Sequence, residues 1–115
     1  MTVTIYGIKN CDTMKKAFVW LESHGIAYTF HDYRVSGIDE ARVAAWCAAA
    51  GWEKILNKSS RTFRALPEAG EALTEARAIE LMVSEPTMIK RPVLDTGNGI
   101  EVGFKADRYS SIFGV

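Results

Sequence analysis

The chain has 115 residues, of which 48% are apolar, and this is enough for one domain with its own core. Its 14 basic and 14 acidic residues give a formal net charge of zero, and no block of like charge runs along the chain. We therefore expect no broad electrostatic attraction to nucleic acid or to a membrane surface. No apolar run is long enough to span a membrane, and the N-terminus reads as a strand rather than a signal peptide. A monomeric cytoplasmic protein is expected.

The first part of the chain predicts strands and helices in alternation. β-branched and aromatic residues indicate the strands, and apolar residues at positions i, i+3, i+4 and i+7 indicate the helices. Asp39 is a typical helix cap, and Gly25 and Gly51 are typical helix stops. The expected elements are a strand over 2–6 that ends at Gly7, a helix over 12–24, a strand over 27–33 and a helix from Asp39 through residue 50. This order implies a parallel strand pair joined by a crossover helix.

The second part predicts a helical stretch, then a hairpin and a last helix. Residues 52–88 contain no convincing strand, but apolar periodicity predicts a helix over about 74–83, with Ile79, Met82 and Val83 facing inward. The sequence "TGNG" is a strong hairpin signal, because glycine and asparagine accept the positive φ angles of tight turns. The elements expected around and after it are strands over 92–95 and 100–103 and a helix over about 107–113.

This order of elements predicts an α/β protein with a thioredoxin-like fold. In such a fold a mixed β-sheet is flanked by helices, and here a helical insertion precedes the third strand. We expect residues 1–115 to form a single domain, with the helical insert at about 52–88. The assignment rests partly on the order of elements and partly on the family resemblance given below.

A cysteine lies in the expected turn between the first strand and the first helix, within "IYGIKNCDTMKK". At a helix N-terminus, Cys11 faces unpaired backbone N–H groups and the positive end of the helix dipole, which both stabilise thiolate over thiol. Lys9 adds a positive charge beside it, whereas Asp12 opposes the thiolate unless its carboxylate turns outward. We expect a reactive thiol with a lowered pKa. The alternative is a small apolar side chain that only packs at the junction.

The second cysteine, Cys47, falls on the apolar side of its predicted helix, beside Trp46 and Val43. A cysteine in that position behaves as a small hydrophobic residue, so we expect it to be buried and inert. The sequence has no Cys-x-x-Cys, and neither His24 nor His31 has the spacing of a zinc ligand. We expect neither a metal site nor a disulfide framework.

Two further segments carry donors that suit an anion. In "IKRPV", Arg91 precedes Pro92 at a strand start, where an X-Pro bond can be cis and a guanidinium can hold a carboxylate or an oxyanion. From the residues alone, a surface arginine at a strand entry explains Arg91 equally well. In "NKSSRTFR", Arg61 lies among basic and hydroxyl side chains that suit small oxyanions, although a solvated polar turn is slightly favoured for any one residue.

Three segments read together suggest a family. They are "TIYGIKNCDTMKKA" near the N-terminus, "ELM…PTMIKRPVL" near residue 90 and "VGFKADRY" near the end. In these motifs, and over essentially its whole length, the chain resembles the arsenate reductase (ArsC)/Spx superfamily and, within it, the YffB-type branch. The resemblance implies a thioredoxin-like fold with a helical insert. It places Cys11 at the nucleophilic cysteine, Arg91 at the arginine before a cis-proline, and Pro92 at that proline.

The resemblance also implies a function. Members of the YffB-type branch are suggested to be glutathione-dependent thiol reductases, and we expect that activity here, with Cys11 as the catalytic residue. Lys9, Asn10, Arg61, Arg91 and Pro92 are expected to bind the substrate or its anionic group. Glutathione is the expected co-substrate and glutaredoxin an expected partner, with no tightly bound cofactor and no direct contact with nucleic acid.

Two alternatives follow from the same resemblance. The first is arsenate reduction linked to glutathione and glutaredoxin, but Asp12 and Thr13 follow the cysteine where arsenate reductases typically have Gly-Thr-Ser. Asn57 stands about where those enzymes carry an arginine, and Arg108 lies in the late segment without a clearly aligned third arginine. The second alternative is a regulator like Spx that binds RNA polymerase. Spx proteins often carry a Cys-x-x-Cys switch, and Met14 replaces its second cysteine here.

Overall fold

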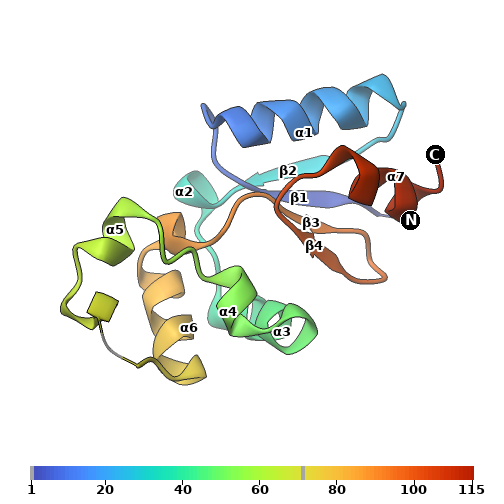
Figure 1. The fold of residues 1–115 in the computed structure, drawn as a ribbon. Helices are drawn as coiled ribbons and strands as arrows, with labels where there is room; N and C mark the ends of the chain where they lie inside the picture. Colours follow the sequence, from blue (N-terminus) through green and yellow to red (C-terminus); the bar gives the residue numbers. More distant parts are fainter. Residues whose placement is uncertain (1, 71) are drawn as a thin grey trace. The chain divides into compact units, whose positions relative to one another are not determined.

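The computed structural model describes residues 2–70 and 72–115 (Figure 1). Two units are distinguished within the chain: the first holds the residues up to Asp32 together with Arg91–Val115, and the second holds Tyr33–Lys90. The elements of the first unit are β1 Thr4–Gly7, α1 Asp12–Ser23, β2 Thr29–Asp32, β3 Val93–Asp95, β4 Ile100–Val102 and α7 Ala106–Phe113. No helix in the described part of the chain is long and apolar enough to cross a membrane.

The first unit contains a four-stranded sheet in the order β2-β1-β3-β4. Strand β1 pairs in parallel with β2, with Thr4 opposite Thr29, and antiparallel with β3, with Ile5 opposite Leu94. Strands β3 and β4 form the antiparallel hairpin that the "TGNG" turn predicts, closed by a 3.1 Å bond from Thr96 N to Gly99 O. The predicted mixed α/β sheet is therefore confirmed, and its two middle strands come from opposite ends of the sequence.

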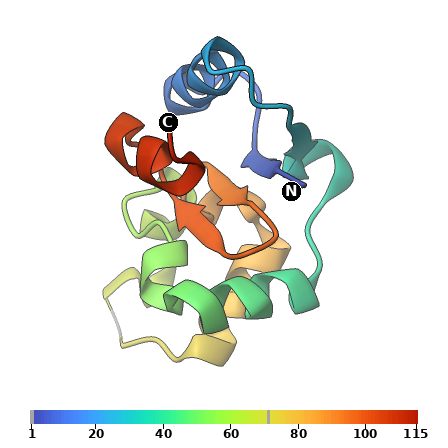
Figure 2. The same cartoon turned by 90° about the vertical axis from the view of Figure 1, so that its right-hand side faces the viewer.

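Helices α1 and α7 pack on the same side of this sheet (Figures 1 and 2). They meet through aromatic rings: Trp20 approaches Tyr109 edge-on at 5.4 Å and Phe113 at 5.9 Å between ring centroids. The buried cluster beneath the helices consists of Val3, Ile5, Met14, Ala17, Leu21, Leu94 and Tyr109. The apolar face predicted for the first helix is thus its core face.

The described residues of the second unit form helices and turns. Its elements are α2 Tyr33–Ser36, α3 Glu40–Ala50, α4 Trp52–Ile55, α5 Arg61–Arg64, η1 Pro67–Gly70, α6 Glu75–Ser84 and η2 Pro86–Met88. Helix α3 packs against α4 and α6, and an isolated bridge joins Leu56 to Ile89. Asp39 caps α3 as expected, since its carboxylate accepts a 2.7 Å bond from Arg42 N.

One predicted boundary and one predicted buried face are corrected. The second strand ends at Asp32, because Tyr33 is buried in the second unit, begins α2 and donates a 3.3 Å hydrogen bond to Ile89 O. Helix α6 buries Ala78, Leu81 and Met82, so the inward face is turned by about one residue from the predicted one, and Ile79 and Val83 are only half-buried. In both cases packing across the unit, which a short sequence window does not reveal, decides the outcome.

Candidate active site

Cys11 lies at the start of α1, four residues after the end of β1. Its backbone is extended, with φ −112° and ψ 127°, and its carbonyl accepts the first helical bond from Lys15 N at 3.0 Å. The side chain is half-buried, with one side packed on the core of the first unit. The predicted N-terminal placement of the thiol is therefore present in the structure.

The loop before Cys11 depends on two backbone features. A Cβ atom at Gly7 would overlap Sδ and Cε of the buried Met14, so a larger residue at position 7 would require the Met14 side chain to move. Asn10 has φ 60°, in the left-handed region that asparagine tolerates better than most residues. Together these residues turn the chain so that Cys11 occupies the helix start.

Strand pairing brings Arg91 to the same place. Tyr6 lies opposite Val93 in the β1–β3 ladder, and continuing that register beyond the strands sets Pro92 and Arg91 beside the loop that leads to Cys11. Gly103 N donates a 2.8 Å bond to Pro92 O, which ties this segment to the end of β4. The Arg91–Pro92 bond is cis, as predicted. The Arg91 side chain lies close enough to the Cys11 thiol to lower the pKa of that thiol, through hydrogen bonding and through its charge.

The pKa of the Cys11 thiol lies below its ordinary value. Partial burial acts to raise this pKa and is the largest single influence. It is outweighed in sum by the backbone N–H of Met14, the Arg91 side chain and the backbone N–H of Thr13, which all favour thiolate. The thiol makes no well-aligned capping bond at α1, so these N–H groups act on it as nearby dipoles and weak donors. A thiol poised in this way is a better nucleophile at neutral pH than a free cysteine.

The neighbours of Cys11 in sequence act differently from the expectation. The positive charge that lowers the thiol pKa is that of Arg91, not that of Lys9, which is exposed in the preceding loop. Asp12 is exposed and is not among the groups that shift the pKa of this thiol. The sequence position of Lys9 indicated proximity along the chain, whereas the strand pairing of Arg91 determines proximity in space.

Arg61 and Asn57 belong to the second unit. Arg61 begins α5, where Ser60 Oγ accepts a 3.2 Å cap bond from Phe63 N, and its side chain is exposed. Asn57 Oδ1 accepts a 3.1 Å bond from Ser59 N, and Asn57 N donates a 2.7 Å bond to Met88 O. Asn57 thus serves the local turn, and a role for Arg61 at the thiol stays a prediction.

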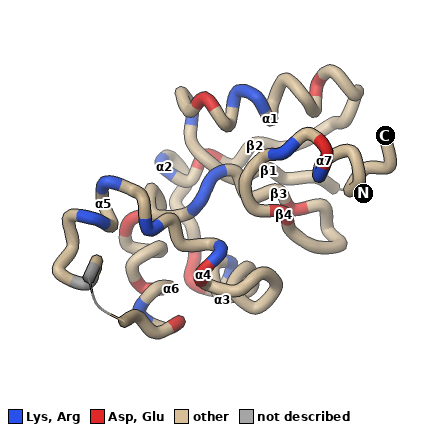
Figure 3. Tube along the Cα trace, viewed as in Figure 1, with Lys and Arg blue, Asp and Glu red and all other residues tan. Residues whose placement is uncertain are grey.

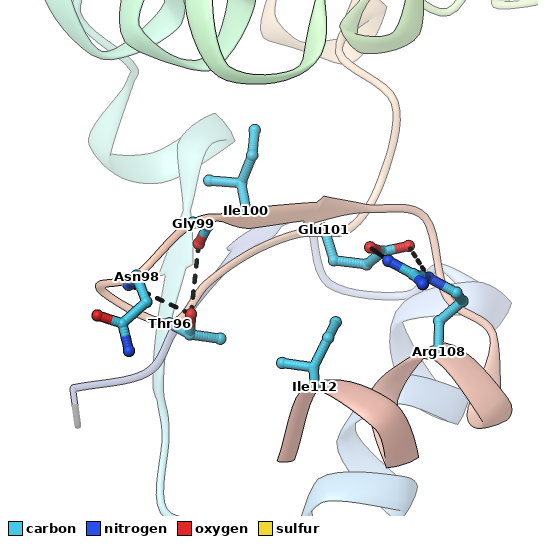
Figure 4. A pocket seen from close by; sticks show the side chains of 7 residues that line it. All are labelled: Thr96, Asn98, Gly99, Ile100, Glu101, Arg108 and Ile112. Atoms are coloured by element: carbon cyan, nitrogen blue, oxygen red, sulfur yellow. Dashed lines mark hydrogen bonds and ion pairs between the residues drawn. The ribbon is translucent and has the colours of Figure 1, made fainter. Parts of the chain in front are cut away.

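Arg108, the basic residue of the late segment, is committed to another contact. Its guanidinium forms a 3.0 Å ion pair with Glu101 on β4, which raises the pKa of Arg108 through the hydrogen bond and the charge of that carboxylate. The pair closes one end of a cavity of about 250 Å³ between the β3–β4 hairpin and α7 (Figure 4). Arg108 is therefore paired within this hairpin–helix cavity.

Cys47 differs from Cys11 in every respect that governs reactivity. It is buried on α3, and burial first and the charge of Glu75 second raise the pKa of its thiol. Both effects favour the unreactive thiol. The described residues contain no group of three or more His, Cys, Asp or Glu side chains placed to hold a metal ion.

Comparison with known proteins gives consistent matches over nearly the whole chain. The sequence profile of the ArsC family matches residues 6–112. An uncharacterized protein of Haemophilus influenzae is 39% identical over 112 residues, which cover 96% of this chain and 98% of that protein. The solved structure of YffB is 54% identical, with 96% of this chain and 97% of YffB covered at a TM-score of 0.92. An arsenate reductase (ArsC) related protein from Brucella melitensis is 49% identical, with 100% and 97% covered at a TM-score of 0.78.

More distant proteins show how far the fold extends. The global transcriptional regulator Spx of Listeria innocua is 27% identical over 107 residues, which cover 91% of this chain and 82% of Spx. A glutaredoxin from Archaeoglobus fulgidus is 12% identical, with 96% of this chain and 84% of the glutaredoxin covered at a TM-score of 0.51, and it shares the fold alone. The thioredoxin-like fold is confirmed by these structures together with that of YffB.

Proposed function

The chain belongs to the ArsC family, and on this premise we propose that it is a glutathione-dependent thiol reductase with Cys11 as its single nucleophilic cysteine. The observation that carries the proposal is the contact at the start of α1. There the Cys11 thiol meets the helix N–H groups and the Arg91 side chain, and its pKa is lowered. The buried Cys47, with its raised pKa, does not share this environment.

The proposed reaction has two thiol–disulfide exchanges. The Cys11 thiolate attacks the glutathione sulfur of a mixed disulfide between glutathione and a substrate thiol; the Cys11–glutathione bond forms, the original S–S bond breaks, and the substrate leaves as a thiolate that takes up a proton. A second glutathione, as thiolate, then attacks the glutathione sulfur bound to Cys11. This step releases oxidised glutathione and restores the Cys11 thiolate. The substrate is reduced by two electrons, and two glutathione molecules are joined.

Arg91 has two roles in this proposal. Its charge and hydrogen bond hold Cys11 as thiolate before attack, and its planar fork then binds a carboxylate of the incoming glutathione. Lys9 and Asn10 are proposed as further contacts for anionic groups of glutathione. The buried Pro92 is proposed to shape the floor of the glutathione site.

Incubation with oxidised glutathione followed by intact mass measurement tests the proposal. The wild-type protein and the Cys47→Ser variant should each gain one glutathione, and Cys11→Ser should gain none. Cys47→Ser is the matched control, because it removes a thiol without touching the site. An adduct on Cys47, or no adduct on either cysteine at neutral pH, would overturn the proposal.

Arsenate reduction at the same cysteine is a second candidate, favoured by the arsenate reductase (ArsC) related protein from Brucella melitensis. Against it, Asn57 is held in a local turn and offers no positive charge, and Arg108 is paired with Glu101. Loss of one charge-assisted bond to the oxyanion costs about 1.5–3 kcal/mol, or one to two orders of magnitude in rate. Robust arsenate turnover with glutathione and glutaredoxin, abolished in Cys11→Ser, would reverse this ranking.

A regulatory role is the alternative from a different class, favoured by the Spx relatives. It predicts a protein partner and needs no turnover. Absence of both the glutathione adduct and arsenate turnover would direct attention to it, and capture of purified RNA polymerase subunits by this protein would then be the decisive assay.

A further inference from the structure

A groove of about 460 Å³ lies between one side of α1 and Phe104, in the segment that joins β4 to α7. The residues that line it include Lys15, Lys16, Val19, Trp20, His24 and Phe104. Its surface is almost entirely apolar, and Val19 within it is 62% exposed. Val19 and the partly buried rings of Trp20 and Phe104 together give the groove its apolar surface.

The aromatic wall of this groove is held from behind. Trp20 and Phe104 both meet the buried ring of Tyr109 edge-on, at 5.4 Å and 4.8 Å between centroids. His24 stacks on Trp20 at 4.0 Å and its Nδ1 lies 2.8 Å from Trp20 O. Because these rings are fixed by the core, the groove is present before any partner binds, and little ordering cost remains to be met on binding.

The groove is lined by two lysines and by the polar side chains of Ser23 and His24. Lys15 and Lys16 line the end nearer the start of α1, and the exposed Lys105 follows Phe104 in the chain. The acidic residues of α1, Asp12 and Glu22, do not line the groove. Figure 3 shows the basic residues in the first half of α1, with acidic residues toward its two ends. The groove thus complements an apolar partner that carries negative charge near one end.

The groove also lies within reach of the reactive thiol. Lys15 is one helical turn from Cys11 and Val19 is two turns from it, which is about 12 Å along the helix axis. An extended peptide advances about 3.3 Å per residue, so roughly four residues span that distance. A substrate peptide whose cysteine sulfur lies at Cys11 can therefore place acidic residues at the lysines and an apolar residue at Val19.

We infer that this groove binds an acidic, apolar segment of a protein whose mixed disulfide with glutathione is reduced at Cys11. The inference rests on the proposed function and adds its substrate class. A protein segment is favoured over a small molecule because small-molecule sites bury about 70–90% of their ligand, which an open surface groove does not do. An amphipathic segment laid along the groove needs no such enclosure.

Direct binding tests the groove without any chemistry. The probe is a peptide of about ten residues in which a serine replaces the cysteine, two glutamates follow it, and leucines stand four and five positions from it. Titration of this peptide into the ¹⁵N-labelled protein should shift the amide signals of Val19 and Ser23 and the indole signal of Trp20. A peptide with lysines in place of the glutamates, and one with serines in place of the leucines, should each bind at least about fivefold more weakly.

Kinetics test whether the groove selects substrates. The glutathionylated cysteine form of the acidic, apolar peptide should react with a kcat/KM about tenfold lower in Val19→Asp and about fivefold lower in Lys16→Glu. Val35→Asp is the matched control, because Val35 is 80% exposed on α2. It should match the wild type. The small uncharged substrate bis(2-hydroxyethyl) disulfide should react equally with all four proteins, since it does not reach the groove.

The outcomes separate the groove from the proposed function. Equal kcat/KM for acidic and basic peptides, or an unchanged kcat/KM in Val19→Asp, would overturn the inference that the groove binds the substrate. The proposed turnover through Cys11 would be unaffected. Peptide binding at Val19 without any adduct or turnover at Cys11 supports the groove as a docking surface and overturns the reductase. Signal shifts that depend on protein concentration and not on peptide would show that a second copy of the chain covers this face, and would overturn the inference.

Discussion

The thiol of Cys11 owes its lowered pKa to groups that are far apart in the sequence. The N–H groups of Thr13 and Met14 come from its own helix, and the guanidinium of Arg91 comes from the start of β3. Burial acts against all three, and the pKa is lowered because the three together exceed it. The reactivity of this residue is therefore a balance, and removal of one favourable group should shift it measurably.

Replacement of Arg91 by methionine should raise the pKa of Cys11, because both the hydrogen bond and the charge are lost while burial remains. The rate of iodoacetamide alkylation against pH, measured in a Cys47→Ala background, gives the midpoint. Lys9→Met is the matched control and should leave the midpoint unchanged. The midpoint of Arg91→Lys should lie between those of the wild type and Arg91→Met, because lysine keeps the charge but lacks the planar fork of arginine. A midpoint that moves in Lys9→Met and not in Arg91→Met would contradict this account of the site.

Asn10 makes a second residue-scale prediction, through its backbone. In Asn10→Ala the left-handed conformation with φ 60° costs about 1 kcal/mol of stability. The same strain should loosen the start of α1, so glutathione adduct formation at Cys11 should slow. Asn10→Gly adopts this conformation without strain and should retain both properties. Urea unfolding measures the stability of each variant, and timed mass spectra measure the rate of adduct formation. Equal loss of adduct formation in the glycine and alanine variants would show instead that the Asn10 amide itself binds glutathione.

At the scale of elements, the predictable parts were those marked by local pattern. The Gly7 strand end, the Asp39 cap and the "TGNG" hairpin all act within a few residues, and each is present in the structure. The high β propensity of Tyr33 favours a strand, but the residue begins α2 and its ring is buried in the second unit. The short helix α5 depends on the Ser60 cap, a signal that the polar composition of "NKSSRTFR" obscured.

The residues of the candidate site also differ in how far local sequence pattern could predict them. Cys11 was predictable because a helix start acts on a thiol locally, whereas the role of Arg91 at that thiol depends on the β1–β3 register. The position of Arg91 before a proline indicated only that it could bind an anion. Its place beside the nucleophilic cysteine was implied by the resemblance to a known family. Lys9 was favoured for its nearness along the chain, a weak guide to distance in space.

The contact between α1 and α7 predicts an unusual effect of a conservative substitution. Tyr109 is fully buried, and its hydroxyl has no hydrogen-bond partner among the described residues. Removal of a buried hydroxyl that makes no bond relieves its desolvation cost, so Tyr109→Phe should stabilise the protein by about 1 kcal/mol in urea unfolding. A loss of stability would show that this hydroxyl is bonded in solution.

The same substitution should change the response to alkali. Burial, and secondarily the charge of Glu101, raise the pKa of Tyr109, so the folded state keeps this phenol neutral. The resulting stabilisation is complete below the unfolded pKa of about 10 and is lost as pH rises above it. Stability should therefore fall less steeply above that pH in Tyr109→Phe than in the wild type.

At the scale of the whole molecule, the two cysteines report on different units. Cys11 lies in the first unit and the buried Cys47 in the second. If the chain is the single domain that its length predicts, both units should unfold together. Over a urea series at neutral pH, alkylation of Cys47 should appear at the same midpoint at which alkylation of Cys11 slows, because unfolding exposes one thiol and restores the ordinary pKa of the other. Fully unfolded protein, which labels both equally, is the control, and two separate midpoints would indicate two domains.

The central strand pair of the sheet joins residues 4–7 to residues 93–95, and this spacing has a consequence during synthesis. A ribosome releases Cys11 long before Arg91 and β3 have been made, so the nascent chain carries a thiol without its guanidinium. The cysteine gains its full reactivity only after the late segment has emerged and paired with β1. We therefore expect incomplete chains to form adducts at Cys11 more slowly than folded ones.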